Sequence, residues 1–280
     1  MPVRGGGDPL AEVWFVGRDP AGELYARRET FALDSLSTGP GGFPVTLGRC
    51  RLDESGASGA VDEAWWELSW QADGEGGYGG ESRLRRTEIV TTQPAIIAQG
   101  TVSVGAREMR VSSWPGHQLH AWGSRHAELS ARMHCNAFPE RGAYLEAVSR
   151  SYRRLGAASP TLTMGAARLA GRTFDARSSA RGLVSPAAIE PDLYEFTIRG
   201  VREQLWGRVT CHPADMVGVS YRDPDGGKVF AYHADKASVD ARLMRRTRRG
   251  WKLEAEVSAA GCCAYEYASR KPVAGVPVVL

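Results

Sequence analysis

The sequence lacks the features that would place it in a disulfide-rich, secreted or membrane-spanning class. Its five cysteines are scattered and form no C-x-x-C pair, and Cys262 and Cys263 are adjacent, so neither a disulfide framework nor a metal-binding spacing is present. No apolar run approaches the about 20 residues that a membrane-spanning helix needs. The N-terminal MPVRGGGDPL has no apolar segment of the kind found in signal peptides. We therefore expect a cytoplasmic protein that does not insert into a membrane.

An excess of one charge sign is also missing. The net charge is +3 over 280 residues, which is too mild for a nucleic-acid footprint, so no nucleic-acid partner is expected. The glycine-rich segment 73–80 has no strand and helix around it in the arrangement of a nucleotide-binding loop. The run RRTRRG at 245–250 is interpreted as a solvated hairpin tip, with an anionic partner as the alternative.

Strand-like alternation, by contrast, is present along the whole chain. In residues 65–70, Trp66, Leu68 and Trp70 fall on one face of a strand. Similar segments recur about every 8 to 12 residues with turn residues between them, which predicts an all-β fold with few short helices. The predicted strands cover 12–16, 24–31, 43–52, 65–70, 87–92, 96–104, 109–113, 161–169, 194–201, 206–212, 216–221, 229–233, 239–244, 251–257 and 263–269. Segments 144–155 and 236–246 also fit a helix, and 171–191 is predicted to be a long loop.

Residues 116–138 contain most of the chemistry, including four of the six histidines. His120 and Trp122 are two residues apart, as are Arg132, His134 and Asn136, so each set projects from one strand face. A chain reversal at residues 123–124 is expected to bring the two rows opposite each other. The prediction is a polar and aromatic floor for a ligand cavity.

Motifs in this region resemble a known family. The order His120-x-Trp122-Gly123-Ser124-Arg125, then HCNAF at 134–138 and EAVS at 146–149, resembles the hallmark region of the AttH-like, tocopherol-cyclase-like proteins, which include carotenoid hydratases and fungal Diels-Alderases. VGVSYRDPDG at 217–226 and YEYASR at 265–270 resemble uncharacterised bacterial members of that group. The resemblance implies two consecutive lipocalin-like antiparallel β-barrels, which we place at residues 1–118 and 119–280, with a ligand cavity at or near their junction.

The candidate catalytic residues are those that could move a proton or orient a reacting oxygen. His120, His134 and Glu146 are candidates for the first task, and Asn136 and Arg125 for the second. Apolar and aromatic residues would bind a hydrophobic substrate, and the aromatic rings would stabilise a cation formed on it. The candidate substrate-binding residues are Trp122, Arg132, Phe138, Tyr144, Tyr221 and His233.

Structural roles compete with each of these assignments. A histidine on a strand is often simply hydrogen-bonded, the Trp122 indole could plug a barrel end, and Arg125 could pair with Glu128 or Glu146. His117 and His126 flank turns and are interpreted as solvated. A zinc site built from His120, His126, His134 and Cys135 is disfavoured, because alternation turns Cys135 away from His134.

Two functions follow from these residues. The first is a cofactor-independent cyclase, hydratase or isomerase, or a pericyclase, that acts on a terpenoid, polyene or polyketide bound in a barrel cavity. The second is a non-catalytic lipocalin-like carrier of such a molecule. The clustered ionisable residues favour the enzyme, since a carrier needs only walls and a few polar anchors. No metal, redox cofactor or macromolecular partner is expected, and the sequence does not predict the oligomeric state.

Overall fold

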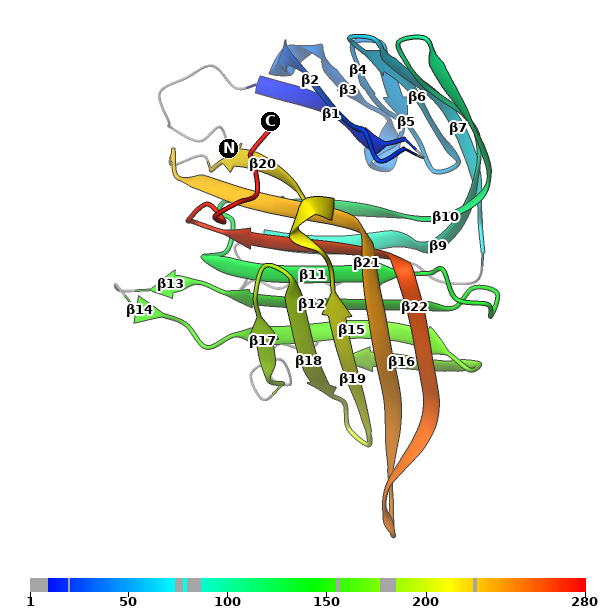
Figure 1. The fold of residues 1–280 in the computed structure, drawn as a ribbon, viewed down its shortest axis with the longest axis vertical. Helices are drawn as coiled ribbons and strands as arrows, with labels where there is room; N and C mark the ends of the chain where they lie inside the picture. Colours follow the sequence, from blue (N-terminus) through cyan, green and yellow to red (C-terminus); the bar gives the residue numbers. More distant parts are fainter. Residues whose placement is uncertain are drawn as a thin grey trace. The chain divides into compact units, whose positions relative to one another are not determined.

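A computed structural model of the chain describes residues 10–19, 21–73, 78–79, 87–154, 157–176, 185–223 and 226–280. Strands form nearly all of the regular structure in these residues (Figure 1). The helices described are three short 3-10 turns, η1 (Leu33–Ser35), η2 (Pro40–Gly42) and η3 (Pro213–Asp215). The prediction of an all-β fold with few short helices is confirmed.

The chain divides into two compact units. Unit 1 consists mainly of residues 74–95 and 117–279, and unit 2 of residues 2–73 and 96–116. Strands β9 (Thr87–Val104) and β10 (Arg107–Gly123) therefore belong partly to each unit. The division at residue 118 into two lipocalin-like barrels stays a prediction.

Unit 2 contains a hairpin and most of an antiparallel sheet. The hairpin pairs β1 (Leu10–Arg18) with β2 (Leu24–Ala32), and the Asp19 side chain closes its turn by accepting a hydrogen bond from the Glu23 backbone nitrogen (2.8 Å). The sheet has the order β10-β9-β7-β6-β5-β4-β3, with β8 paired to β9. Its remaining strands are β3 (Leu36–Thr38), β4 (Val45–Leu47), β5 (Cys50–Leu52), β6 (Gly56–Val61), β7 (Ala64–Ala72) and β8 (Tyr78–Gly79).

Unit 1 is built on a ten-stranded sheet of order β16-β15-β12-β11-β22-β21-β19-β18-β17, in which β20 also pairs with β21. All of its described strand pairs are antiparallel. The strands are β11 (Leu129–Cys135), β12 (Tyr144–Ser151), β15 (Leu162–Leu169), β16 (Arg172–Ala176), β17 (Ala187–Ile189), β18 (Leu193–Arg199), β19 (Glu203–Thr210), β20 (Val217–Arg222), β21 (Lys228–Thr247) and β22 (Gly250–Ser269). A separate short pair joins β13 (Arg153–Arg154) to β14 (Ala157–Ala158).

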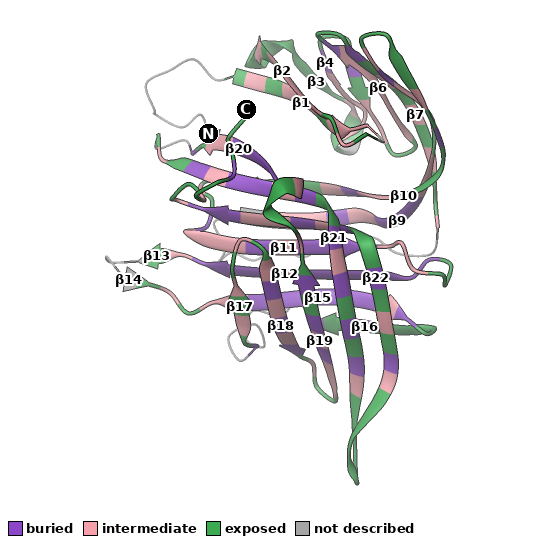
Figure 2. Cartoon of the chain, viewed as in Figure 1, coloured by how far each residue is buried: buried purple, intermediate pink, exposed green. Residues whose placement is uncertain are grey.

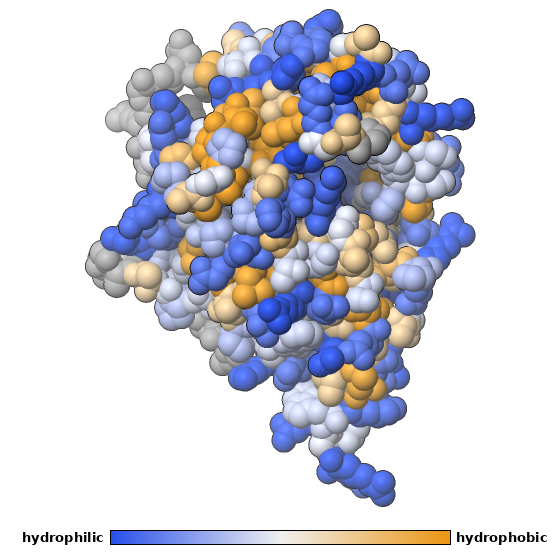
Figure 3. Space-filling model, in the orientation of Figure 1, coloured by the Kyte–Doolittle hydropathy of each residue, from blue (hydrophilic) through white to orange (hydrophobic). Residues whose placement is uncertain are grey.

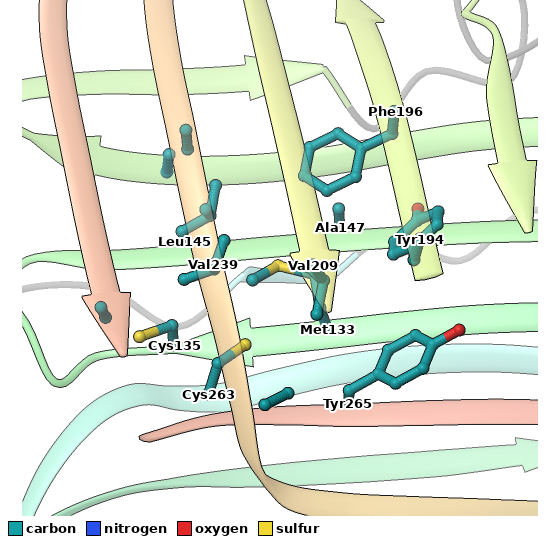
Figure 4. Close-up of a cluster of buried hydrophobic side chains, with 14 of the residues drawn as sticks. Met133, Cys135, Leu145, Ala147, Tyr194, Phe196, Val209, Val239, Cys263 and Tyr265 are labelled. Carbon is teal, nitrogen blue, oxygen red and sulfur yellow. The ribbon is translucent and has the colours of Figure 1, made fainter. Parts of the chain in front are cut away.

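The large sheet curls into a half-barrel around a hydrophobic core (Figures 1 and 2). Alternate residues of each strand point inward, as the labelled side chains of β11, β12 and β22 do in Figure 4. Each large apolar side chain that is fully buried contributes about 1.5–3 kcal/mol to stability. Burial of these side chains therefore favours the curled shape of the sheet. The core includes Met133, Cys135, Leu145, Ala147, Phe174, Tyr194, Phe196, Tyr232, Cys263 and Tyr265.

The two longest strands each combine two predicted ones. Segments 229–233 and 239–244 lie in β21, while 251–257 and 263–269 lie in β22. Register shifts at Ala234/Ala237, Ala237/Val239 and Leu243/Met244 interrupt the pairing of β21 with β22 without ending either strand. Such bulges bend a strand and increase its twist. They therefore allow one long strand to follow the curvature of the sheet without ending.

Four other predictions concern segments that the structure corrects, completes or leaves largely undescribed. Segments 144–155 and 236–246, which also fitted a helix, contain β12 and part of β21. The predicted loop 171–191 contains β16 and β17 at its two ends, while residues 177–184 lie outside the described part of the chain. The predicted glycine-rich loop 73–80 also lies largely outside it, apart from Asp73 and β8. Segments 87–92 and 96–104 form the single strand β9.

Candidate functional site

The candidate site lies in unit 1, on the face of the sheet opposite the hydrophobic core. His134 of β11 and Glu146 of β12 are direct partners across the two strands. Met133 and Leu145, their neighbours along the chain, point into the core. Alternation therefore places His134 and Glu146 together on the other face, where residues of β9 and β10 contact them.

His134 is hydrogen-bonded at both ring nitrogens and is only 2% exposed. Nε2 lies 2.8 Å from the Pro94 carbonyl oxygen, and Nδ1 lies 3.2 Å from Glu146 Oε2. Because a carbonyl oxygen can only accept, Nε2 must carry a hydrogen and donate it. The contact with Pro94 thus fixes one proton on the ring and leaves Nδ1 facing the carboxyl group.

Glu146 receives a second hydrogen bond on the same oxygen. Thr91 Oγ1, which is fully buried, donates to Oε2 at 2.7 Å, and Arg132 Nη2 lies 3.8 Å away. If neither His134 Nδ1 nor Oε2 held a proton, two lone pairs would face each other in a buried place, at a cost of about 1–3 kcal/mol or more. The pair therefore retains one proton, either on the imidazole or on the carboxyl group.

His117 of β10 lies against this pair. Its ring stacks on that of His134 with 3.9 Å between centroids and 23° between planes. Arg132 Nη2 donates to His117 Nε2 (3.2 Å), so Nε2 is the acceptor and the ring proton lies on Nδ1. Burial, followed by the charges of His134 and Arg132, lowers the pKa of His117 well below its ordinary value, with Glu146 acting in the opposite direction. His117 is therefore neutral near pH 7.

Arg132 is the cation of the cluster and has hydrogen-bonding capacity left. Its side chain is 13% exposed. Its Nε is buried and has no hydrogen-bond partner among the described residues. A buried guanidinium N–H without an acceptor is costly, and a ligand oxygen could satisfy it. Arg132 lies two residues before His134 on β11, so this donor is on the same face of the sheet as the His134–Glu146 pair.

A second polar cluster lies on the same face of the sheet, around Tyr221 of β20. The Tyr221 hydroxyl lies 3.5 Å from His233 Nε2, and His233 Nδ1 lies 3.5 Å from Glu266 Oε2. On its other side the Tyr221 ring stacks against His126, with 5.5 Å between centroids. Burial and then the Glu266 charge raise the pKa of Tyr221, so its hydroxyl keeps its proton near pH 7.

His126 is held by a buried carboxylate. Its backbone nitrogen donates to Asp223 Oδ1 (2.9 Å), and its Nδ1 lies 2.6 Å from the same oxygen. Arg270 Nη2 lies 2.7 Å from Asp223 Oδ2 and donates to the His126 carbonyl oxygen (2.8 Å). Burial raises the pKa of Asp223, but the hydrogen bonds from His126 and Arg270 outweigh it and lower the pKa overall. These contacts fix the segment between β10 and β11.

The two clusters belong to one polar strip across the sheet. Glu266 of β22 is the direct partner of Arg132 on one side and of His233 on the other. Directly opposed residues of antiparallel strands share a face, so the strip runs from β12 through β11 and β22 to β21 and β20. It is buried at the His134 end and half-exposed at the His233 end, where the His233 side chain is 34% exposed.

The structure brings together part of the predicted site. Arg132, His134 and Glu146 form its centre, and Tyr221 contacts His233. Tyr144 is buried two residues before Glu146 on the same strand. Asn136 follows the end of β11 and is partly buried, as is Arg125 in the segment before β11.

The predicted pairing of the two central rows is wrong. β10 pairs with β9, and β11 pairs with β12 and β22, so no hairpin at residues 123–124 brings His120 and Trp122 opposite His134. His120 is exposed, and Trp122 is 37% exposed with its ring 5.0 Å from that of His120. Phe138 packs against the hydrophobic core, on the other side of the sheet from His134.

Sequence reasoning missed several members of the site. His117, interpreted as solvated, is partly buried and stacks on His134. His126 is exposed, as interpreted, but its Nδ1 also contacts Asp223. Thr91, the Pro94 carbonyl group and Arg270 were not among the predicted site residues. Their roles depend on strand pairs that are distant in sequence, and no local pattern marks them. His117 lies three residues before His120 and five before Trp122, so alternation places it on the other strand face from that row.

Neither a group of side chains suited to a metal ion nor a membrane-spanning helix is found among the described residues. Among those residues, no group of three or more histidine, cysteine, aspartate or glutamate side chains is arranged to hold a metal ion. The four residues considered for zinc are separated, with Cys135 in the core and His126 bound to Asp223. None of the described helices has the length and apolar character needed to cross a bilayer.

Comparison with known proteins gives relatives but no activity. No family model matches the chain. Over 260 residues it is 26% identical to an uncharacterised protein of Mycobacterium tuberculosis, found in strain CDC 1551 / Oshkosh and in strain H37Rv. The alignment covers 88% of this chain and 74% of the relative. The chain is thus similar, over most of its length, to mycobacterial proteins whose names state no function.

Proposed function

We propose that this protein is a cofactor-independent enzyme that adds or moves a proton on a hydrophobic small molecule, as a cyclase, hydratase or isomerase does. The observation that carries the proposal is the buried His134–Glu146 pair, whose hydrogen bonds require it to retain a proton. A held proton beside a neutral histidine is an arrangement suited to general acid–base catalysis. The resemblance of residues 120–149 to tocopherol-cyclase-like proteins adds the class of substrate, a terpenoid, polyene or polyketide.

In the proposed reaction, the protein supplies a proton and later recovers one. A proton from the His134–Glu146 pair is transferred to a substrate double bond, whose π electrons form the new C–H bond. The carbocation closes on a second double bond or is captured by water. Loss of a proton from the intermediate restores the pair, so no oxidant or reductant is needed. Each positioned acid or base typically contributes about 10²–10⁴ in rate.

The partly exposed residues would contact the substrate. Arg132 would donate its unpaired Nε–H to a carbonyl or hydroxyl oxygen and orient it. Asn136, Arg125 and His120 remain candidates for polar contacts. Trp122, Tyr144, Tyr221 and His233 remain candidates for the aromatic and polar surroundings of the ligand.

A non-catalytic carrier is the second candidate, and one observation favours it. His134 is 2% exposed and has a hydrogen-bond partner at each ring nitrogen, as a purely structural histidine would. In a carrier, the cluster would join β9 and β10 to β11 and β12, and Arg132 would anchor the polar end of the ligand.

The test is to identify small molecules that copurify with the protein by mass spectrometry and to incubate them with it in D2O. Proton transfer from the pair predicts a product that carries deuterium at carbon, because the pair exchanges with solvent before reaction. His134→Gln and Glu146→Gln should lower turnover by about 10²–10⁴ while affinity stays within a few-fold. A pericyclic reaction would give product without deuterium.

Glu256→Gln is the matched control, since Glu256 pairs with Arg242 at the surface. It should leave turnover unchanged. If the copurified compound is bound but unchanged by the wild-type protein, and the Arg132→Gln variant loses affinity, the protein is a carrier and the enzymatic proposal is wrong.

A further inference from the structure

The β21–β22 hairpin ends in a segment of unusual composition. Residues 245–253, RRTRRGWKL, contain five basic and no acidic residues. β19 pairs with β21 only as far as Glu203 and Arg245, so the hairpin end extends beyond its neighbour (Figure 1). β22 pairs with β11 only from residue 264 onward, and in the described chain its first residues, 250–259, have β21 as their strand partner.

One face of this hairpin end carries exposed apolar side chains. In β22, Ala255 pairs with Leu243 on the core face, but the register shift at Leu243/Met244 follows, so Leu253 and Trp251 lie on the opposite face. Leu253 is 45% exposed and Trp251 48%. Met244 pairs with Leu253 across the hairpin. Figure 3 shows the hydrophilic end of the hairpin with a hydrophobic patch next to it.

The arginines around this apolar face are available for an external partner. The side chains of Arg246, Arg248 and Arg249 are exposed, and none forms an ion pair with any residue that the structure describes. Arg245 and Lys252 instead pair with Glu254, at 3.0 and 3.6 Å. Glu254 also lies 2.8 Å from Arg172 of β16, which ties the base of the hairpin to another strand.

A neighbouring turn has the same character. Between β18 and β19, Val201 is 78% exposed and Arg202 is exposed. The Arg202 carbonyl oxygen accepts a hydrogen bond from the Arg246 backbone nitrogen (2.7 Å), which places the two turns side by side. Apolar and cationic groups from both turns therefore form one surface, which we call the hairpin tip: Val201, Arg202, Arg246, Arg248, Arg249, Trp251 and Leu253.

We propose that the hairpin tip docks on an anionic membrane surface. Tryptophan is favoured at the boundary between lipid headgroups and acyl chains, and arginines beside it bind the headgroup phosphates. The valine and leucine gain by burial among the upper acyl carbons. A nucleic acid would use the arginines and could stack on Trp251, but it offers nothing for Val201 and Leu253. The docking is peripheral, and it does not depend on the His134 site.

Binding to phospholipid vesicles tests this directly. The protein should sediment with vesicles of phosphatidylglycerol and phosphatidylcholine at low salt and should not sediment with phosphatidylcholine alone. The variant Arg246→Gln, Arg248→Gln, Arg249→Gln should bind roughly a hundredfold more weakly, since each basic residue near an anionic surface is worth about fivefold in affinity. The control variant Arg49→Gln, Arg110→Gln, Arg208→Gln removes the same charge at exposed positions elsewhere and should bind nearly as the wild type does.

A second measurement does not depend on charge. Brominated acyl chains in the anionic vesicles should quench part of the tryptophan fluorescence, and Trp251→Phe should remove that quenched part, while its circular dichroism spectrum stays unchanged. Equal loss of binding in the tip and control variants would overturn the proposal. So would binding of a fluorescent single-stranded oligonucleotide without vesicle binding, or a dimer in solution that Trp251→Ser dissociates.

Discussion

His134 Nδ1 lies 3.2 Å from Glu146 Oε2, while the other nitrogen of the same ring donates to the Pro94 carbonyl oxygen. The contact with Pro94 determines which ring nitrogen carries the proton, and so what the contact with Glu146 requires. With one ring proton fixed at Nε2, the contact between Nδ1 and the carboxyl group is favourable only if it holds a proton of its own. Thr91 completes the surroundings of Oε2. The His134–Glu146 pair therefore holds one proton, on the face of the sheet opposite the hydrophobic core.

Removing the carboxyl group should destabilise the fold. Glu146→Ala leaves buried polar groups on Thr91 and His134 without a partner, and we expect the free energy of unfolding to fall by about 3–5 kcal/mol. Glu146→Gln should cost less, because its amide can donate to Nδ1. Urea unfolding followed by circular dichroism measures both. Glu256→Ala, which removes a surface partner of Arg242, should cost under about 1 kcal/mol; equal losses for Glu146→Ala and Glu256→Ala would contradict the buried pair.

The neutral state of His117 predicts a dependence of stability on pH. Its pKa in the folded protein is lowered, so below the unfolded value of about 6.5 the unfolded chain binds more protons than the folded one. Stability should therefore be complete above pH 6.5 and fall as the pH falls below it, by at most about 1.4 kcal/mol per pH unit from this group. His117→Gln keeps an acceptor for Arg132 and should show a smaller fall between pH 6.5 and 5 in urea titrations. Identical slopes for the two proteins would contradict a lowered pKa.

Close packing of β12 against β15 predicts that any side chain at Gly165 lowers the stability of the fold. A Cβ atom at this position would lie 2.3 Å from the Glu146 carbonyl oxygen and 3.2 Å from the Ala147 Cα, so the strands would have to separate. We expect Gly165→Ala to lower the free energy of unfolding by about 3 kcal/mol, the upper part of the range for overpacking. Gly17→Ala is the control, since its Cβ would make only an ordinary contact with Phe15 at 3.5 Å, and it should change stability by less than about 0.5 kcal/mol.

The sequence predicted local structure better than pairing. Alternation identified most strands, and the spacing of Arg132 and His134 placed both on one face, as the structure has them. It could not show that β11 pairs with β22, because that pairing joins segments from distant parts of the chain and leaves no local signal. For the same reason His117 was interpreted as solvated, although its contact with His134 comes from the course of β10 across the sheet.

The local sequence pattern also could not show that β21 and β22 are each one continuous strand. Residues 234–238 and 258–262 look like breaks in sequence, since they contain small and polar residues between apolar runs. In the structure, β21 and β22 continue through these segments by shifting register. The energy that keeps the strands continuous comes from the core they pack against, which alternation in a short window does not reveal.

Nuclear magnetic resonance of the His134 ring nitrogens and the Glu146 carboxyl carbon, in one labelled sample at pH 7, tests the stored proton most directly. In Glu146→Gln the amide donates to Nδ1, so His134 should be neutral with its proton on Nε2, which supplies the reference spectrum. In the wild-type protein we predict one proton on the pair, seen either as a doubly protonated imidazole beside an ionised carboxylate or as a neutral imidazole beside a protonated carboxyl group. A neutral His134 together with an ionised Glu146 would contradict the proposed acid–base role.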